Sequence, residues 1–210
     1  MNLTNKLTIV IALILATSQV QAHSEPKDRY HYTNPNGDVD VIVIHAIGGP
    51  YCDNGTVKFS PAGKDAEFWK SDFEANNNIS IHYIIDREGK VASSIPEENR
   101  ADHAWGHNYN SIGIELVNNG DGKDKYPSVQ LTSLLNLVTD IAKRRNLKSK
   151  NIVRHSDIDT RFFTCGGIRV KKKQDPGPAF PWSSFKADVA TALGESTTSP
   201  SVTPVSPSIQ

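Results

Sequence analysis

Two histidines and one aspartate of this chain have side chains of the types that bind zinc, and each is predicted to stand on rigid backbone. His45 follows the β-branched run 39–44, which is typical of a buried strand that presents a side chain at its end. His155 follows the apolar pair 152–153 in the same way, and Asp175 opens an Asp-Pro-Gly-Pro turn. Two imidazoles and a carboxylate fill three positions of a tetrahedral zinc ion and leave the fourth open to water, as in a catalytic site.

A fourth candidate is Glu115, which lies in the middle of the apolar run 112–117. A carboxylate inside a buried strand is costly unless it is paired or used in a reaction. The alternative for Glu115 is an outward-facing glutamate on a half-exposed strand. The alternative for His45 is an ordinary core histidine with its hydrogen bonds satisfied. These residues by themselves therefore leave a metal site and a purely structural role both open.

The chain of 210 residues is long enough for one domain with flanking segments. Its 23 basic and 23 acidic residues are mixed along the sequence, so no basic field points to nucleic acid as a partner. We find no internal repeat and no second domain, and the sequence does not indicate an oligomeric state.

Residues 1–22 are interpreted as a cleaved secretory signal. Lys6 is the only charged residue before Glu25, and the apolar run 7–16 is too short to span a bilayer. Small residues at the end of the segment suit a signal peptidase, and the alternative is an uncleaved anchor. We expect an exported product, periplasmic or secreted, without a stable membrane anchor after cleavage.

Strands that alternate with helices predict an α/β domain, with a central mixed sheet flanked by helices. The domain is predicted to span 23–194, and the Ser/Thr/Pro-rich segment 195–210 is predicted to be a disordered tail. The predicted strands are 39–44, 79–85, 91–95, 112–117 and the short one at 152–153; the predicted helices are 64–74, one capped by Ser128 that ends near 145, and one that starts at Ser183 or Ser184 and ends at Gly194.

The two cysteines, Cys52 and Cys165, would meet an oxidising compartment in an exported protein. A disulfide between them would close a long loop. Two free buried thiols are the alternative, and the spacing does not decide between them.

Five motifs occur in order along the chain: Val-Ile-Val-Ile-His (41–45), Ser-Ile-His-Tyr-Ile-Ile-Asp-Arg-Glu-Gly-Lys (80–90), Ser-Ile-Gly-Ile-Glu-Leu (111–116), Arg-His-Ser-Asp-Ile (154–158) and Lys-Gln-Asp-Pro-Gly-Pro (173–178). Together they resemble the type 2 N-acetylmuramoyl-L-alanine amidases, the family that includes T7 lysozyme and the peptidoglycan-recognition proteins. The resemblance covers about 39–193 and implies the T7 lysozyme-like amidase fold.

The resemblance implies one zinc ion held by His45, His155 and Asp175. The implied substrate is peptidoglycan or a muropeptide, and the implied reaction is hydrolysis of the amide between the lactyl group of N-acetylmuramic acid and L-alanine of the stem peptide. The rivals are a non-catalytic peptidoglycan-binding module of the same fold and a zinc peptidase that cuts cell-wall peptides. The presence of all three ligands and Glu115 argues against the binding module.

Two further roles come from the resemblance. Glu115 matches the family's acid and would act as general base, and Lys173 matches the lysine that steadies the oxyanion. The alternative for Lys173 is a solvated member of the lysine run 171–173, which leaves the assignment open by one position. Some family members carry a catalytic tyrosine where this chain has Ile81, so that role, if needed, falls to Glu115.

Three residues are predicted to bind the substrate. His103 precedes an alanine and matches the family's Trp-His-Ala-Gly loop, although Asp102 stands in place of the tryptophan. Asn118 and Arg161 are the other two.

The chain also departs from the family pattern after its His-Ser-Asp motif. Residues 162–172 are interposed between Arg161 and Lys173, which are usually close in sequence. This insertion carries Cys165 and is predicted to form a lip over the cleft, or to be pinned by Cys52 beside the metal site.

Overall fold

The computed structural model describes residues 38–195. The predicted signal at 1–22, the beginning of the predicted domain at 23–37 and the tail from residue 196 lie outside the described residues. Among the described residues, no helix is both long and apolar enough to cross a membrane.

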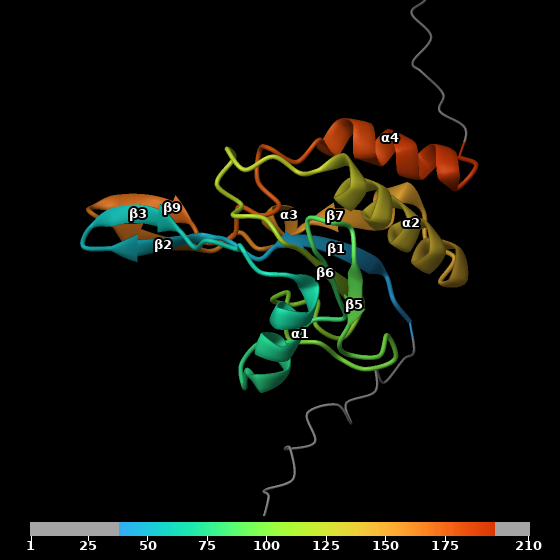
Figure 1. Cartoon of the computed structure of the whole chain (residues 1–210), viewed down its shortest axis with the longest axis horizontal. Helices are drawn as coiled ribbons and strands as arrows, with labels where there is room; N and C mark the ends of the chain where they lie inside the picture. The colour runs from blue at the N-terminus through green and yellow to red at the C-terminus, as the bar shows by residue number, and fades with distance from the viewer. Residues whose placement is uncertain (1–37, 196–210) are drawn as a thin grey trace, which may run out of the picture.

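A five-stranded sheet forms the centre of the molecule, with the strand order β5-β4-β6-β1-β7 (Figure 1). Its strands are β1 (Val41–Ala46), β4 (Tyr83–Ile85), β5 (Val91–Ser93), β6 (Ser111–Leu116) and β7 (Ile152–Arg154). Strands β4, β6, β1 and β7 pair in parallel with their neighbours, and β5 is antiparallel to β4. The predicted mixed sheet is confirmed.

Helices cover both faces of this sheet, as predicted. The helices are α1 (Ala66–Ala75), α2 (Ser128–Arg144), α3 (His155–Ile158) and α4 (Trp182–Ala192), with a 3-10 turn at Ser149–Asn151. The larger core lies between the sheet and the pair α2 and α4, while α1 packs on the opposite face (Figure 1). Buried isoleucines of β1 and β6 at alternate positions point into the larger core, because successive strand residues face opposite sides.

The predicted start of α2 was wrong by one residue. Ser128 is the first helical residue, and the N-cap position is held by Pro127, whose extended backbone leads into the helix. The Pro127 carbonyl accepts the first helical hydrogen bond, from Leu131 N at 3.1 Å, and no side chain caps the helix. Helix α4 likewise begins early, at Trp182 directly after Pro181, whereas the predicted start was Ser183 or Ser184.

Two β-hairpins project from the sheet on the side of the carboxyl ends of its parallel strands (Figure 1). The first consists of β2 (Pro50–Asp53) and β3 (Thr56–Phe59), and the second of β8 (Phe162–Cys165) and β9 (Ile168–Lys171). A disulfide joins Cys52 to Cys165, so the alternative of two free thiols is wrong. The turns also touch, because a Cβ atom on Gly166 would lie 2.2 Å from Gly55 O.

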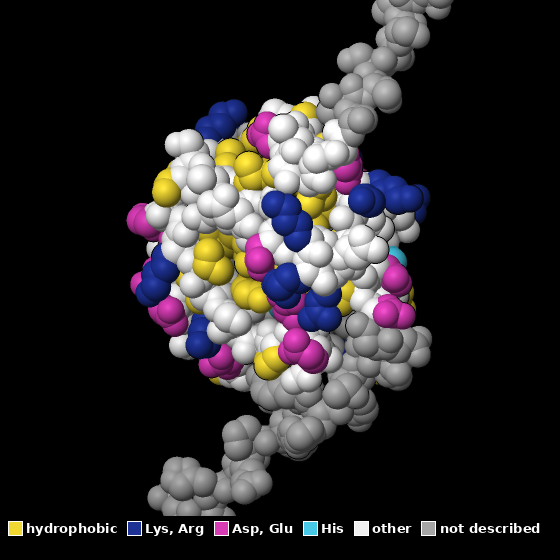
Figure 2. All heavy atoms as spheres, turned by 90° about the vertical axis from the view of Figure 1, so that its right-hand side faces the viewer, with side chains coloured by type: hydrophobic (Ala, Val, Ile, Leu, Met, Phe, Trp, Pro, Cys, Tyr) yellow, Lys and Arg dark blue, Asp and Glu magenta, His cyan; other side chains and the backbone are white. Residues whose placement is uncertain are grey.

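Basic and acidic side chains are interspersed over the face shown in Figure 2. One ion-pair network reaches inward, where the nearly buried Glu97 accepts hydrogen bonds from Arg144, Arg145 and the Tyr83 hydroxyl. Burial alone would raise the pKa of Glu97, but the hydrogen bonds from Arg144 and the other two partners lower it to about 2. The network therefore fastens the loop after β5 to helix α2.

Replacing Glu97 with glutamine tests this anchor. Because the folded pKa is lower than the ordinary value of 4.5, the carboxylate stabilises the fold above about pH 4.5, and this contribution is lost as the pH falls towards 2. We expect E97Q to lower the free energy of unfolding by about 2 kcal/mol at pH 7. In urea titrations the difference from the wild type should shrink between pH 4.5 and 2. E98Q, at the exposed neighbour of Glu97, is the control, and an equal effect of both variants would contradict the assignment.

Removing the disulfide tests the coupling of the two hairpins. The double variant C52S/C165S leaves no free thiol and opens a loop of 113 residues. We expect its free energy of unfolding to fall by about 2–4 kcal/mol, measured by urea titration. The same loss should follow reduction of the wild type and should be absent when the double variant is reduced. An unchanged free energy would show that the disulfide contributes nothing to the folded domain.

Candidate active site

The parallel strands β6, β1 and β7 bring three of the predicted residues to one edge of the sheet. His45, near the end of β1, is the register partner of Glu115 on β6. On the other side, Ile44 is the partner of Arg154, the last residue of β7, so His155 follows beside His45. The carboxyl edge of parallel strands is the usual place for a site in an α/β sheet.

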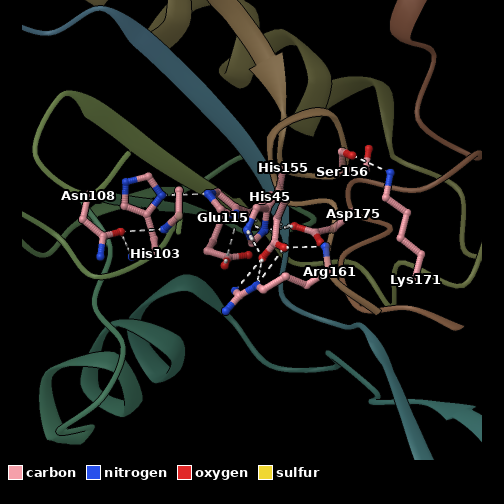
Figure 3. Close-up of polar contacts among 11 residues, drawn as sticks. His45, His103, Asn108, Glu115, His155, Ser156, Arg161, Lys171 and Asp175 are labelled. Carbon is pink, nitrogen blue, oxygen red and sulfur yellow. Dashed lines mark hydrogen bonds and ion pairs between the residues drawn. The ribbon is translucent and has the colours of Figure 1, made fainter. Parts of the chain in front are cut away.

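Asp175 joins the two histidines from the segment before α4. His45 Nδ1 lies 2.8 Å from His155 Nδ1 and 3.3 Å from Asp175 Oδ2, and His155 Nδ1 lies 2.9 Å from the same oxygen (Figure 3). All three residues are buried. Among residues 38–195 they form the one group of three or more histidine, cysteine or acidic side chains placed to hold a metal ion.

The three atoms suit a zinc ion. Two imidazole nitrogens and a carboxylate oxygen are a ligand set that zinc takes in catalytic sites. Ligands on a tetrahedral zinc ion lie roughly 3.3 Å apart, so an outward movement of the imidazoles by about 0.5 Å admits the ion. Burial and the neighbouring His155 lower the pKa of His45 to about 4, so its imidazole is neutral at pH 7, as metal binding requires.

Asp175 is held as a carboxylate. Burial by itself would raise the pKa of Asp175, but the hydrogen bond with His155, and next the neighbouring His45, outweigh it and lower the pKa well below its usual range. Its backbone is fixed as well, because Ser156 N donates to Asp175 O at 3.0 Å.

Glu115 lies beside this cluster and is largely buried, with 12% of its side chain exposed. Its Oε1 is 4.0 Å from His45 Nδ1, and its Oε2 is buried without a hydrogen-bond partner among the described residues. Burial, and next the negative charge of Asp175, raise the pKa of Glu115 to about 8, while Lys173 opposes the shift. The outward-facing glutamate considered from the sequence is not what the structure shows, and this carboxyl group can both take and give a proton near neutral pH.

The three lysines of the run 171–173 have different surroundings. Lys171 Nζ donates to the carbonyl of Ser156, and Lys172 is exposed and borders the two larger hollows but not the one that contains His45. Lys173 borders the hollow that contains Glu115, and its charge lowers the pKa of that carboxyl group. Lys173 is therefore the member of the run that faces the cluster, and its role in the reaction stays a prediction.

Three hollows meet at the cluster and together form a groove. All three are bordered by Ile79 and Lys173. The one of about 550 Å³ passes Arg161 and Trp105, and the one of about 290 Å³ passes Tyr51 at the base of the first hairpin. The groove thus leads away from the cluster in two directions, as a cleft for an extended substrate requires.

Arg161 lies in the groove and is held by a residue that the sequence analysis missed. Its guanidinium forms hydrogen bonds to the buried Asp159 and stacks over the Trp105 ring at 4.7 Å. Asp159 Oδ2 also lies 3.9 Å from His155 Nε2, on the side of the ring away from the cluster. The spacing of four residues between His155 and Asp159 within a helical turn is the signal that could have revealed this pair.

His103 and Asn118 are placed differently from Arg161. His103 borders the groove, but both of its ring nitrogens have partners in the protein, His45 Nε2 at 2.9 Å and Ser111 Oγ at 3.1 Å. Asn118 is buried, and its side chain donates to Asp124 O and accepts from Gly120 N, which holds the loop after β6. Contact of either side chain with a substrate stays a prediction.

A family model described as N-acetylmuramoyl-L-alanine amidase matches residues 35–178. The chain belongs to this family. The resemblance to type 2 amidases stated from the sequence is thereby confirmed, and with it the class of enzyme, a peptidoglycan amidase.

Curated amidases align with most of the chain. The 1,6-anhydro-N-acetylmuramyl-L-alanine amidase AmpD of Enterobacter cloacae is 30% identical over 190 residues, which cover 79% of this chain and 92% of that protein. N-acetylmuramoyl-L-alanine amidase A of Achromobacter lyticus is 22% identical over 170 residues, or 76% and 88% of the two chains.

Solved amidase structures share the fold. A selenomethionine derivative of AmpD superimposes with a TM-score of 0.54 and 25% identity, over 78% of this chain and 91% of that one. The Escherichia coli amidase AmiD, solved with the substrate anhydro-N-acetylmuramic acid-L-Ala-D-gamma-Glu-L-Lys, gives a TM-score of 0.54 with 24% identity over 75% of this chain and 58% of AmiD. The predicted T7 lysozyme-like amidase fold is confirmed.

Replacing Asp175 with asparagine tests the metal site. The substitution removes the charged ligand and keeps the shape of the side chain, so we expect zinc affinity to fall by about 100-fold or more while the circular dichroism spectrum is retained. Competition with a chromophoric chelator measures the affinity. D157N is the matched control, because Asp157 lies in the same region and forms an ion pair with Arg154 instead. Unchanged affinity in D175N would rule out this ligand set.

Proposed function

We propose that the protein is a zinc-dependent hydrolase that cleaves the amide bond between the lactyl group of N-acetylmuramic acid and L-alanine of the peptidoglycan stem peptide. The observation that carries the proposal is the convergence of His45, His155 and Asp175 with the unpaired carboxyl oxygen of Glu115 beside them. The family match supports the class of substrate.

His45, His155 and Asp175 would hold the ion through Nδ1, Nδ1 and Oδ2. A bound zinc ion lowers the pKa of its water to about 7 and polarises a carbonyl oxygen. The negative set of Asp175 and Glu115 fits this role, because two buried carboxyl groups close together need a cation for both to ionise. A divalent cation in the site would also lower the pKa of Glu115 from about 8, and so favour the base form before the reaction.

Glu115 would take the proton from the attacking water and then give it to the amine of L-alanine as that amine leaves. Its position supports both steps, since Oε2 has no competing hydrogen bond within residues 38–195 and the side chain borders the same hollow as His45 and Lys173. Lys173 would donate a hydrogen bond to the carbonyl oxygen as negative charge develops on it.

The substrate would lie along the groove on both sides of the cluster. We infer that the arm beside Arg161 and Trp105 takes an anionic or sugar part of a muropeptide, because a guanidinium binds carboxylates and an indole ring packs on apolar sugar faces. His103 and Asn118 complete the predicted substrate side, with His103 at the wall of this arm and Asn118 beside Gly48, which borders the other arm.

We also propose that the enzyme is exported. Residues 1–22 have the charge and apolar pattern of a secretory signal, and the disulfide between Cys52 and Cys165 is of the kind that persists in oxidising compartments. Both features support a periplasmic or secreted location, where peptidoglycan would be the substrate.

The test is mass spectrometry of purified muropeptides incubated with the protein. We expect stem peptides that begin at L-alanine, their loss when a chelator is added, and their return with zinc. E115Q should bind zinc as the wild type does and should lose activity by about 100-fold or more, because the carboxylate that moves the proton is gone. E98Q, at a side chain that is 71% exposed and pairs with Arg145, is the control for activity.

The other outcomes separate the rival functions. Intact muropeptides in every reaction would favour a binding module, and cuts within the stem peptide would favour a zinc peptidase. Full activity of a zinc-free protein would contradict the metal mechanism.

A further inference from the structure

Ser111, Gly113 and Glu115 lie on one face of β6, because alternate strand residues point to the same side. The neighbours between them, Ile112 and Ile114, point into the larger core on the other side of the sheet. Glu115 lies at the metal cluster, which leaves the two small residues of this face to be explained.

A row of hydrogen bonds runs from the metal cluster along this face. His45 Nε2 lies 2.9 Å from His103 Nδ1, and His103 Nε2 lies 3.1 Å from Ser111 Oγ (Figure 3 shows the contact of the two rings). Ser111 Oγ in turn donates to the carbonyl of His107 at 2.6 Å. We call His45, His103, Ser111 and the His107 carbonyl the His45 chain.

The last member fixes the direction of every bond in the His45 chain. A carbonyl oxygen only accepts, so the single hydroxyl proton of Ser111 goes to His107 O. Ser111 Oγ is then the acceptor for His103, which must carry its proton on Nε2. His103 Nδ1 is left with a lone pair and accepts from His45 Nε2–H, and His45 Nδ1 therefore has a free lone pair that points at Asp175 and His155.

The surroundings hold the His103 ring in this place. A Cβ atom on Gly113 would lie 2.6 Å from His103 Nδ1, so only glycine leaves room for the ring at that strand position. Asn108 Oδ1 accepts hydrogen bonds from the backbone N–H groups of His103 and Ala104, which fixes the loop.

We propose that His103 and Ser111 are positioning residues that hold His45 in the tautomer with the proton on Nε2, so that Nδ1 is presented to the zinc ion. The proposal rests on the zinc site of the proposed function. In this role His103 supports the metal ligand His45, in addition to forming part of the wall of the groove. Ser111 and Gly113 then lie on the face of Glu115 because Ser111 binds the His103 ring and Gly113 leaves room for it. Partners of this kind orient a ligating imidazole and raise its basicity.

The first experiment measures the tautomers in the metal-free protein, so its result does not depend on zinc binding. A long-range ¹H–¹⁵N correlation spectrum of the histidine side chains should show His103 and His45 both protonated at Nε2 and neutral at pH 7. The H103N spectrum assigns the His103 signals. A proton on Nδ1 of His103 would exchange the donors and acceptors of the His45 chain and overturn the proposal, whatever the enzyme activity is.

The second experiment measures zinc affinity by competition with a chelator. H103L removes both hydrogen bonds at similar volume, and we expect it to weaken zinc binding by about 10- to 100-fold. H103N should recover most of this loss, because the asparagine oxygen can stand near the position of Nδ1 and accept from His45. S111A should weaken zinc binding less than H103L.

H107A is the matched control, because it comes from the same loop and keeps the backbone carbonyl that ends the His45 chain. Each variant is compared with the wild type by urea titration without metal, which separates a change in folding from a change in zinc affinity. Equal zinc affinity of H103L, H103N and the wild type would overturn the proposal. If D175N also bound zinc as the wild type does, the metal site itself would be wrong, so the two failures are distinguishable.

Discussion

The active site depends on one constraint of the sheet, the parallel register of β6, β1 and β7. This register makes His45 the neighbour of Glu115 and sets His155 beside it. A slip by one residue would turn the whole set to the opposite face, because side chains alternate along a strand. The slip is prevented by fully buried isoleucines at the alternate positions, which fill the core under α2 and α4. The apolar side chains on one face of these strands therefore determine where the polar side chains on the other face come together.

The same arrangement gathers ionisable side chains in a largely buried part of the protein. Two imidazoles and two carboxyl groups lie within a few ångströms of one another, and the pKa values of the two carboxyl groups shift in opposite directions, down for Asp175 and up for Glu115. The difference follows from the partners of each group, since His155 Nδ1 lies at hydrogen-bond distance from Asp175 Oδ2, whereas Glu115 Oε2 has no partner among the described residues. One carboxyl group is thus fitted to hold a cation and the other to carry a proton, although both sit in one pocket.

The sequence predicts those parts of the fold that depend on local pattern. The β-branched run before His45 and the apolar residues of α2 are such patterns, and both elements form, although β1 spans Val41–Ala46 where 39–44 was predicted. Long-range pairings leave no such signal, so the disulfide stayed undecided, and the two projecting hairpins and the bond between His103 and His45 were not predicted. The predicted start of α2 was wrong for a different reason. Pro127 holds the N-cap position that was expected for Ser128.

The insertion at 162–172 separates Arg161 from Lys173 in sequence, whereas the resemblance to the family implies that the two lie close together. The structure removes this difficulty. β8 and β9 pair as a hairpin, and Lys172 N donates to Arg161 O at 2.8 Å just below it, so the chain returns to the point it left. A hairpin whose ends meet adds length without moving the residues on either side, and the disulfide ties its strand to the neighbouring hairpin away from the ligands. Arg161 and Lys173 therefore border the same hollow, and the metal cluster tolerates an insertion only two residues before Asp175.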